Sequence, residues 1–195
     1  MYNFFALLSR MKYINRWGLM RSTREENLSE HSLEVAIIAH ALALLGKKRF
    51  NRDLDENKIA VLSLFHDSTE ILTGDLPTPI KYYNEEMKRT YDEIEHIAKK
   101  KILDFLPDDL RDEYEGIISK KEEDADLWRY VKAADKISAL IKCIEERKMG
   151  NNEFVLAESS IRKALDSYNM AEVDCFLKEF LPSYELTLDE QDRLF

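Results

Sequence analysis

Four ionisable side chains interrupt helical stripes that are otherwise apolar, and this pattern constrains the chain more than any other feature. His66 and Asp67 are adjacent in the segment LFHDSTE, His31 lies in ENLSEHSLEVA, and Asp135 lies in VKAADKISAL. On the helices that these segments predict, all four face inward among Leu, Ile, Val and Ala. Burying an imidazole or a carboxylate without a partner is costly. The pattern therefore predicts one shared partner, a divalent metal ion held by all four side chains.

The composition favours a single all-α domain over residues 1–195. The chain is 45% hydrophobic, which is enough for one sizeable core, and it has only 5 Gly and 4 Pro for turns. No repeat and no long linker divides it. The formal charge of −9 argues against a nucleic-acid polymer as the main partner, because such binding needs a basic face. A small phosphate ligand needs only one or two local cations and stays compatible with this charge.

The sequence also predicts a cytoplasmic protein. Cys143 and Cys175 lack metal-type spacing, so we expect two reduced thiols in the core. No apolar run approaches the ~20 residues of a membrane span, which argues against a membrane partner. The apolar N-terminal segment contains Arg10 and Lys12, unlike a signal peptide.

Apolar periodicity predicts a succession of helices with one break. The break is at TGDLPTPIK, where one Gly and two Pro within seven residues cannot continue a helix. Ser29 is the expected N-cap of the helix that carries His31, and Gly46 is its expected end. The helix that starts at Asp53 or Asp55 is expected to include His66. The predicted helices cover residues 4–14, 29–46, 53 or 55 to 66, 84–106, 108–118, 122–148, 153–168 and 171–181.

Five segments together closely resemble the HD-domain 5'-deoxynucleotidases of the YfbR type. They are RWGLMR, ENLSEHSLEVA, FHDSTEILTGDLPTPIKY, VKAADKISALIKCIEE and GNNEF. A His-Asp dipeptide alone occurs by chance in many proteins, but its combination with a Glu three residues later and with GDLPTP is specific. The resemblance implies a bundle of helices with the metal site in its core, and it implies a homodimer. It also implies the removal of phosphate from deoxynucleoside 5'-monophosphates.

The ligand set fits this chemistry independently of the resemblance. A metal ion can bind the oxygens of a phosphate dianion and lower the pKa of a water molecule. Neutral imidazoles with carboxylates suit Mn, Co, Ni, Zn or Fe(II) better than Mg, which prefers oxygen ligands alone. We therefore expect one divalent transition metal ion per chain, Co, Mn or similar, and the sequence leaves its identity open.

Glu70 and Asp75 are the two candidates for proton transfer. Glu70 follows His66 by four residues, so on one continuous helix both would share a face. It could act as general base towards water or as general acid towards the leaving group. The alternative is a surface glutamate. Asp75, in the loop that follows, is a second conceivable base, and the sequence leaves both open. The resemblance places both in the active site, with Leu76, Pro77 and Thr78 along the substrate.

Arg16 and Trp17 lie in the polar stretch after the first predicted helix. The planar guanidinium of Arg16 matches phosphate oxygens, and Trp17 offers a flat ring with one donor. The resemblance implies that this pair contacts the nucleotide, together with His31, and that the Trp excludes the ribose 2'-hydroxyl. Crowding by such a ring can weaken the binding of a ribonucleotide by a few kcal/mol relative to a deoxyribonucleotide. The alternative is a surface Arg beside a Trp that anchors the helix.

Two other functions remain open from the sequence. One is another HD-type phosphohydrolase, a phosphodiesterase or a nucleoside polyphosphate hydrolase. Such enzymes usually need more ligands or more substrate contacts, and this short chain shows no additional His cluster. The other is a non-catalytic nucleotide-binding protein. Glu70 beside a complete ligand set argues against it, because sensing does not require a proton-transfer group.

Overall fold

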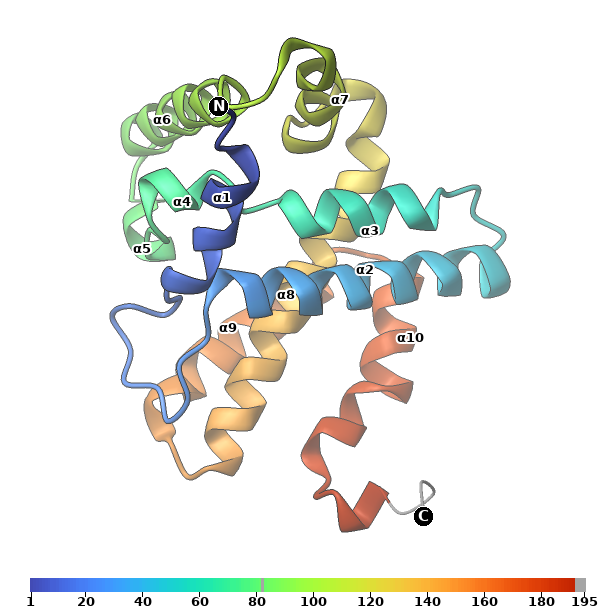
Figure 1. Ribbon diagram of the computed structural model, residues 1–195. Helices are drawn as coiled ribbons and strands as arrows, with labels where there is room; N and C mark the ends of the chain where they lie inside the picture. The colour runs from blue at the N-terminus through green and yellow to red at the C-terminus, as the bar shows by residue number, and fades with distance from the viewer. Residues whose placement is uncertain (82, 192–195) are drawn as a thin grey trace.

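The chain folds into helices joined by short turns (Figure 1). The computed structural model describes residues 1–81 and 83–191, apart from the side chain of Thr78. Within these residues there is no β-strand, and one isolated antiparallel bridge joins Asn15 to Asn27. The all-α fold class predicted from the sequence is confirmed.

Three helices form the centre of the structure. They are α2 (Leu28–Arg49), α3 (Glu56–Phe65) and α8 (Ala125–Lys148). In Figure 1, α2 and α3 run side by side and α8 crosses behind them. Apolar residues at helical spacing face this crossing and are buried, which removes their side chains from water. They include Val35, Leu42, Ile59, Ile137 and Ile141.

A second apolar cluster joins α1 (Phe4–Leu8), α6 (Glu85–Leu103) and α7 (Asp108–Ile118). Phe4 is 1% exposed in this cluster. Its ring packs edge-on with that of Tyr114, with 4.7 Å between the ring centroids. Tyr114 also contacts Phe65, the last residue of α3, with 5.8 Å between ring centroids. This cluster therefore holds the end of α3, the point at which the His-Asp dipeptide begins.

Shorter elements complete the chain around this frame. Two of them, α4 and α5, lie between α3 and α6, close to α1 in Figure 1. Short 3-10 helices occur at Ser9–Tyr13, Glu122–Asp124, Asn152–Phe154, Leu181–Glu185 and Asp189–Gln191. The remaining α-helices are α4 (Glu70–Thr73), α5 (Thr78–Lys81), α9 (Val155–Asp166) and α10 (Ala171–Glu179).

Both predicted ends of α2 are wrong. The N-cap is Asn27, whose side chain accepts from the backbone N–H groups of Ser29 and Glu30. Gly46 does not end the helix, which continues to Arg49. A Cβ at Gly46 would come within 3.1 Å of Leu54, so the glycine allows close packing of the next segment.

The helix predicted to include His66 ends one residue earlier, at Phe65. Residues 66–69 form a tight turn with bonds such as Glu70 N–H to Asp67 C=O, 2.9 Å, and α4 follows as a separate short helix. The predicted break is confirmed at Gly74, whose φ of 74° favours glycine. The first predicted helix is also interrupted, because a 3-10 helix replaces the α-helix from Ser9 onward.

Two details differ from the expectations drawn from the sequence. By length and composition α2 is apolar enough to span a membrane, although 56% of its apolar stretch is buried, as in the core helix of a globular protein. Cys143 is a buried free thiol as expected, but Cys175 is only half-buried, and its Sγ accepts from Arg49 at 2.8 Å.

A buried ion pair on α8 holds the segment 15–27 in place. Lys142 and Glu146 lie one turn apart, 5% and 1% exposed, with 2.5 Å between Nζ and Oε1. Glu146 accepts from the backbone N–H and the hydroxyl of Thr23, and Lys142 donates to the carbonyl of Arg24. Burial alone would raise the pKa of Glu146, but Lys142, Thr23 and Asn151 lower it to about 2. The segment that carries Arg16 is therefore fixed to the core helix.

We expect Glu146→Ala to lower the free energy of unfolding by about 3 kcal/mol, because it leaves Lys142 buried without its partner. The depressed pKa means that this contribution is present above the ordinary Glu pKa and is lost as the pH falls towards 2. Urea unfolding at pH 7 and at pH 3 measures both effects. Glu145→Ala, at the half-buried neighbouring position, is the control and should change stability much less. Equal losses in the two variants would contradict the prediction.

Candidate metal centre

The four predicted ligands meet where α2, α8 and the end of α3 converge. His31 is in the first turn of α2, Asp135 is in α8, and His66 and Asp67 are in the turn after α3. One ligand atom from each of His31, His66 and Asp67 lies within 4.8 Å of the other two. Asp135 is not part of that tight group, but its Oδ1 is 3.1 Å from Nε2 of His31.

In the described part of the chain, the two imidazoles of this cluster have hydrogen-bond partners at Nδ1 but not at Nε2. Neither Nε2 atom has a hydrogen-bond partner among the described residues, although a carboxylate oxygen stands 3.1 Å from each. Nδ1 of His66 is 2.7 Å from the carbonyl oxygen of Ser63. Because a carbonyl only accepts, Nδ1 of His66 carries a proton, and in the neutral ring Nε2 then has the lone pair. A buried Nε2 atom beside the Asp67 carboxylate fits metal ligation.

The charges of the cluster suit a cation. Burial would raise the pKa of both carboxyls, but His66 lowers that of Asp67 to about 2, and His31 holds that of Asp135 well below its usual range. Burial and the Arg16 charge lower the pKa of His31, whereas Asp67 outweighs burial and raises that of His66. At neutral pH the carboxylates are ionised and His31 is neutral, the forms that bind a metal ion.

The cluster is closed on one side and open on the other. His31 is fully buried, whereas the side chains of Asp67 and Asp135 are 23% and 27% exposed. Two imidazoles and two carboxylates match a divalent transition ion, and the exposed side leaves room for water and a phosphate oxygen. The residues present therefore fit the predicted metal.

Glu70 is buried at the start of α4, which excludes the alternative of a surface glutamate. It is not one helical turn after His66, because the turn at residues 66–69 intervenes. Its Oε2 atom has no hydrogen-bond partner among the described residues. Burial, with the nearby charges of Asp67 and Asp75, raises its pKa to about 9. Without a cation beside it, Glu70 carries a proton at neutral pH.

Asp75 follows Gly74 in the loop between α4 and α5. Its Oδ2 accepts from the backbone N–H of Trp17 at 3.3 Å, so this loop touches the Arg-Trp segment. Burial raises the pKa of Asp75, and the Arg16 charge and this hydrogen bond oppose the shift. Leu76 and Pro77 are half-buried in the same loop. The side chain of Thr78, the last residue predicted here, lies outside the described part of the chain.

Arg16 and Trp17 border the cluster, and the alternative of a surface Arg is excluded. The Arg16 side chain is 13% exposed, with Nη1 2.7 Å from Nδ1 of His31 and Nη2 3.8 Å from Asp135. Trp17 has a left-handed φ of 62°, which is uncommon outside glycine and typical of constrained functional segments. Its ring packs edge-on against Phe154, with 5.2 Å between centroids.

Three residues near the site were missed by sequence reasoning. One oxygen of Glu26 accepts from both Arg16 and Trp17, at 3.0 and 2.8 Å. Ser138 and Glu34 lie beside His31, with 3.1 Å from the Ser138 hydroxyl to Nδ1. Helical spacing could have indicated Glu34 and Ser138, since each lies three residues after a predicted ligand and so shares its helix face.

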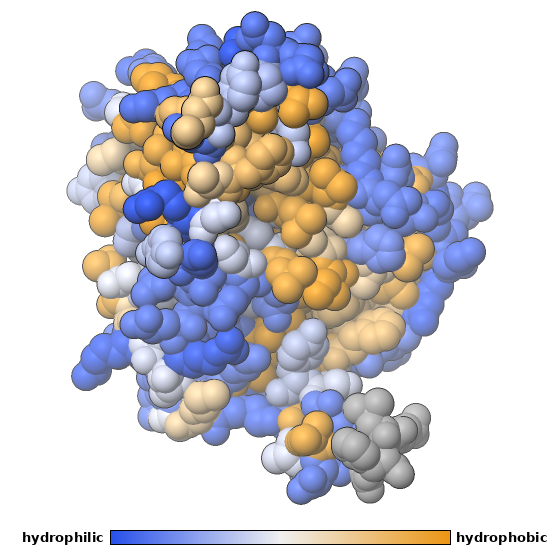
Figure 2. Space-filling model, in the orientation of Figure 1, coloured by the Kyte–Doolittle hydropathy of each residue, from blue (hydrophilic) through white to orange (hydrophobic). Residues whose placement is uncertain are grey.

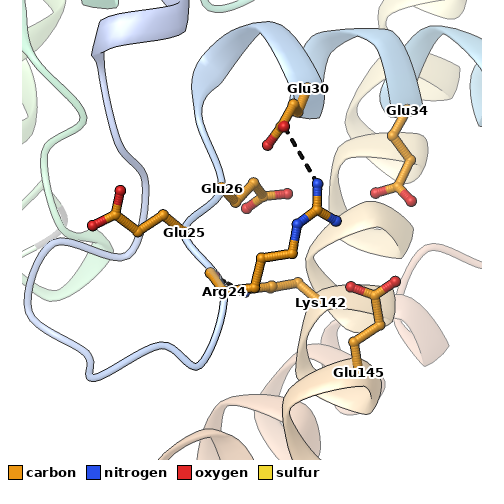
Figure 3. Close-up of a pocket in the computed structure, with 7 residues that line it drawn as sticks. All are labelled: Arg24, Glu25, Glu26, Glu30, Glu34, Lys142 and Glu145. Carbon is orange, nitrogen blue, oxygen red and sulfur yellow. Dashed lines mark hydrogen bonds and ion pairs between the residues drawn. The ribbon is translucent and has the colours of Figure 1, made fainter. Parts of the chain in front are cut away.

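An acidic pocket of about 160 Å³ adjoins the site (Figure 3). We use this name for the cavity between the segment 24–26, α2 and α8. In Figure 3, Arg24 reaches towards Glu30, and the carboxylates of Glu34 and Glu145 lie on the side of α8. None of the predicted ligands lines this pocket. Its lining residues are Arg24, Glu25, Glu26, Glu30, Glu34, Lys142 and Glu145.

Comparisons with known proteins agree with this geometry. The model of the YfbR-like 5'-deoxynucleotidase family matches residues 3–184. A 5'-deoxynucleotidase of Enterobacter sp. (strain 638) is 48% identical over 188 residues, 96% of this chain and 94% of that protein. The 5'-deoxynucleotidase YfbR of Salmonella paratyphi B matches with the same identity and coverage.

Solved structures share the fold. An HD-domain phosphohydrolase from Listeria innocua superposes with a TM-score of 0.83 at 25% identity, over 97% of this chain and 91% of that one. The cyanophage S-2L HD phosphohydrolase DatZ, bound to dA and one catalytic Zn²⁺, superposes with a TM-score of 0.63 at 18% identity, over 93% of this chain and 96% of that one. These matches confirm the resemblance seen in the sequence and the HD-type arrangement of helices. The chain belongs to the YfbR-like 5'-deoxynucleotidase family.

Proposed function

We propose that this protein is a metal-dependent 5'-deoxynucleotidase that converts deoxyribonucleoside 5'-monophosphates to deoxyribonucleosides and phosphate. The observation that carries the proposal is the convergence of His31, His66, Asp67 and Asp135 from three elements, where neither Nε2 atom has a hydrogen-bond partner in the described part of the chain. We assign these four as ligands of one ion per chain, Co, Mn or a similar divalent metal. Residues 1–195 act as one HD phosphohydrolase domain.

The residues around the ligands supply binding and charge. A bound divalent ion provides positive charge for the phosphate oxygens and lowers the pKa of an attacking water. The Arg16 guanidinium, almost buried beside the cluster, offers paired donors for the phosphate. Asp75, Leu76, Pro77 and Thr78 belong to the loop that we assign to the nucleoside. Pro77 stiffens this loop, which reduces the cost of ordering it around the ligand.

Glu70 is the better candidate for proton transfer than Asp75. It is buried, and its Oε2 has no hydrogen-bond partner among the described residues. In the absence of a cation, burial raises its pKa to about 9, and in this protonated form Glu70 could give a proton to the leaving 5'-oxygen. With its pKa lowered by a neighbouring cation it could instead accept a proton from water. Asp75 has one oxygen engaged by the Trp17 N–H, which supports a role in holding the two substrate segments together.

Trp17 is the proposed barrier against ribonucleotides. The residue is held at three points: the indole N–H donates to Glu26, the ring packs against Phe154, and the backbone N–H donates to Asp75. A ring fixed in this way cannot move aside for a 2'-hydroxyl, which would also lack a hydrogen-bond partner. The three restraints support selection of deoxyribose by a rigid wall.

A substrate panel tests the proposed reaction against its alternatives. Metal-stripped protein reloaded with Co²⁺ or Mn²⁺ should release phosphate from deoxyribonucleoside 5'-monophosphates, and far less from ribonucleoside monophosphates. Hydrolysis of a cyclic dinucleotide would instead indicate a phosphodiesterase, and release of pyrophosphate or triphosphate would indicate a nucleoside polyphosphate hydrolase. Tight binding without turnover would indicate a nucleotide-binding protein.

Variants at Asp67 and Glu70 should separate metal binding from proton transfer. We expect Asp67→Ala to lose both bound metal and activity, because it removes a ligand. Glu70→Gln should keep the metal, since Glu70 is not a ligand, and should lower kcat by about 10²-fold or more. Elemental analysis and phosphate release measure the two effects. Wild-type turnover by Glu70→Gln, with a loss in Asp75→Asn, would move the proton-transfer role to Asp75.

Trp17→Ala should narrow the ratio of kcat/KM between deoxyribo- and ribonucleoside monophosphates by about tenfold or more, because it removes the wall beside the sugar. Paired assays with dAMP and AMP measure the ratio. Tyr13→Ala, an exposed aromatic residue of the preceding 3-10 helix, is the control and should leave the ratio unchanged. An unchanged ratio in Trp17→Ala would exclude the ring as the sugar barrier.

A cytoplasmic homodimer completes the proposal. Figure 2 shows hydrophobic residues gathered over the face crossed by α2 and α3. Leu33 and Ile37, one turn apart on α2, are 57% and 62% exposed, and Ile37 lines an apolar groove with Phe180. Exposed apolar patches of this kind are typical of protein interfaces. The free cysteines, Cys143 and Cys175, suit a reducing compartment.

Ile37→Asp should shift the protein from dimer to monomer, because it places a charge in the proposed apolar interface. Light scattering coupled to gel filtration measures the mass of each species. Leu156→Asp is the control, at an 81% exposed apolar position on α9. A monomeric wild type, or a dimer that Ile37→Asp leaves intact, would contradict the assignment of this face.

A further inference from the structure

Two pairs of residues interlock where α2 meets α8. His31 and Glu34 are three residues apart on α2, and Asp135 and Ser138 are three apart on α8, so each pair shares a helix face. His31 contacts both residues of α8, with 3.1 Å from Nε2 to Asp135 and 3.1 Å from Nδ1 to Ser138. The Ser138 hydroxyl donates to Oε2 of Glu34 at 2.5 Å. Ser138 of α8 thus contacts the His31 ring of α2, and Glu34 of α2 holds Ser138 in turn.

The direction of the Ser138 bond determines what this hydroxyl can do for His31. A serine hydroxyl has one proton, and here the proton is directed to the carboxylate of Glu34. Its oxygen is therefore available to accept the proton of Nδ1. With Nδ1 protonated, Nε2 of His31 has the lone pair that a metal ion requires. Both Ser138 and His31 are fully buried, so water does not replace this partner.

Arg16 contacts the same nitrogen, Nδ1 of His31, but favours the other tautomer of the ring. Its Nη1 is 2.7 Å from Nδ1 of His31, and a guanidinium can only donate. That contact requires the lone pair on Nδ1 and hence the proton on Nε2, the tautomer that cannot hold a metal ion. The two partners of Nδ1 therefore favour different states of His31, and only the contact with Ser138 is compatible with ligation.

We propose that Ser138 and Glu34 are positioning residues that fix His31 in its metal-binding tautomer, and that metal binding releases Arg16 from His31 to meet the phosphate. The inference rests on the proposed metal site. It adds two residues that touch neither metal nor substrate. It also gives Glu34 a role in the acidic pocket, where Figure 3 shows it beside α8. Second partners of ligating histidines commonly contribute 10- to 100-fold to metal affinity.

The test is the affinity of metal-stripped protein for Co²⁺, measured by competition with a chelator. Ser138→Ala should weaken Co²⁺ binding by about 10- to 100-fold, and Ser138→Thr, which keeps the hydroxyl, should restore most of it. Glu34→Ala should weaken binding similarly, because the Ser138 proton then turns to Nδ1. The double variant should be little worse than either single one, since the two residues act in series.

Ser32→Ala is the matched control. Ser32 is also buried, is adjacent to His31 in the chain, and its hydroxyl has no hydrogen-bond partner among the described residues. It should bind Co²⁺ like the wild type. Arg16→Ala should bind Co²⁺ at least as tightly as the wild type, because it removes the competing donor and a positive charge. Thermal unfolding without metal, little changed among the variants, separates loss of affinity from loss of fold.

Three results would decide against the inference. Wild-type affinity in Ser138→Ala would exclude the hydroxyl, and a loss as large in Ser32→Ala would show a packing effect. A loss in Arg16→Ala equal to that in Ser138→Ala would make Arg16 the residue that orients His31. Failure of the metal site itself is distinguishable, because then wild-type protein and His31→Ala would bind Co²⁺ equally.

Discussion

The burial of His31 between α2 and α8 is the constraint on which the other features of the site depend. A fully buried imidazole needs partners at both nitrogens. Ser138 of α8 contacts Nδ1 of His31, whereas Nε2 has a carboxylate nearby and no hydrogen-bond partner among the described residues, which leaves it to the proposed metal ion. Asp135 faces one nitrogen, while Ser138 and Arg16 share the other. The apolar residues around this crossing set the distance between the helices, so the core that stabilises the fold also sets the geometry of the ligands.

The residues that we assign to substrate recognition include a segment with little regular structure of its own. Residues 15–27 are held by the bridge between Asn15 and Asn27, and by the buried pair of Lys142 and Glu146. Glu26 then connects the two side chains assigned to the phosphate and the sugar. Loops that carry function commonly obtain their precision from a rigid scaffold in this way. Here the scaffold is α8, which also carries Asp135. The residues that we assign to the metal and those that we assign to the substrate are therefore held by the same helix.

The sequence predicted the parts of this structure that depend on periodicity. The stripes of α2, α3 and α8 were visible, and the inward ligands could be read from them. The tight turn after Phe65 was missed, because LFHDSTE continues a helical pattern while its backbone bonds change to shorter spacing. The end of α2 was misplaced, because Gly46 serves packing against Leu54 and not termination. The contacts of Glu146 with Thr23 join positions far apart in the chain, and those of Glu26 with Arg16 and Trp17 cross an irregular segment without helical spacing, so no local pattern could indicate them.

The central claim is that four side chains from three elements hold one cation. Anomalous diffraction at the cobalt absorption edge, from crystals of Co²⁺-loaded protein, tests it most directly. We expect one strong peak per chain, bonded to Nε2 of His31, Nε2 of His66 and carboxylate oxygens of Asp67 and Asp135. A peak elsewhere in the chain, or none between these four groups at full Co²⁺ loading, would contradict the account.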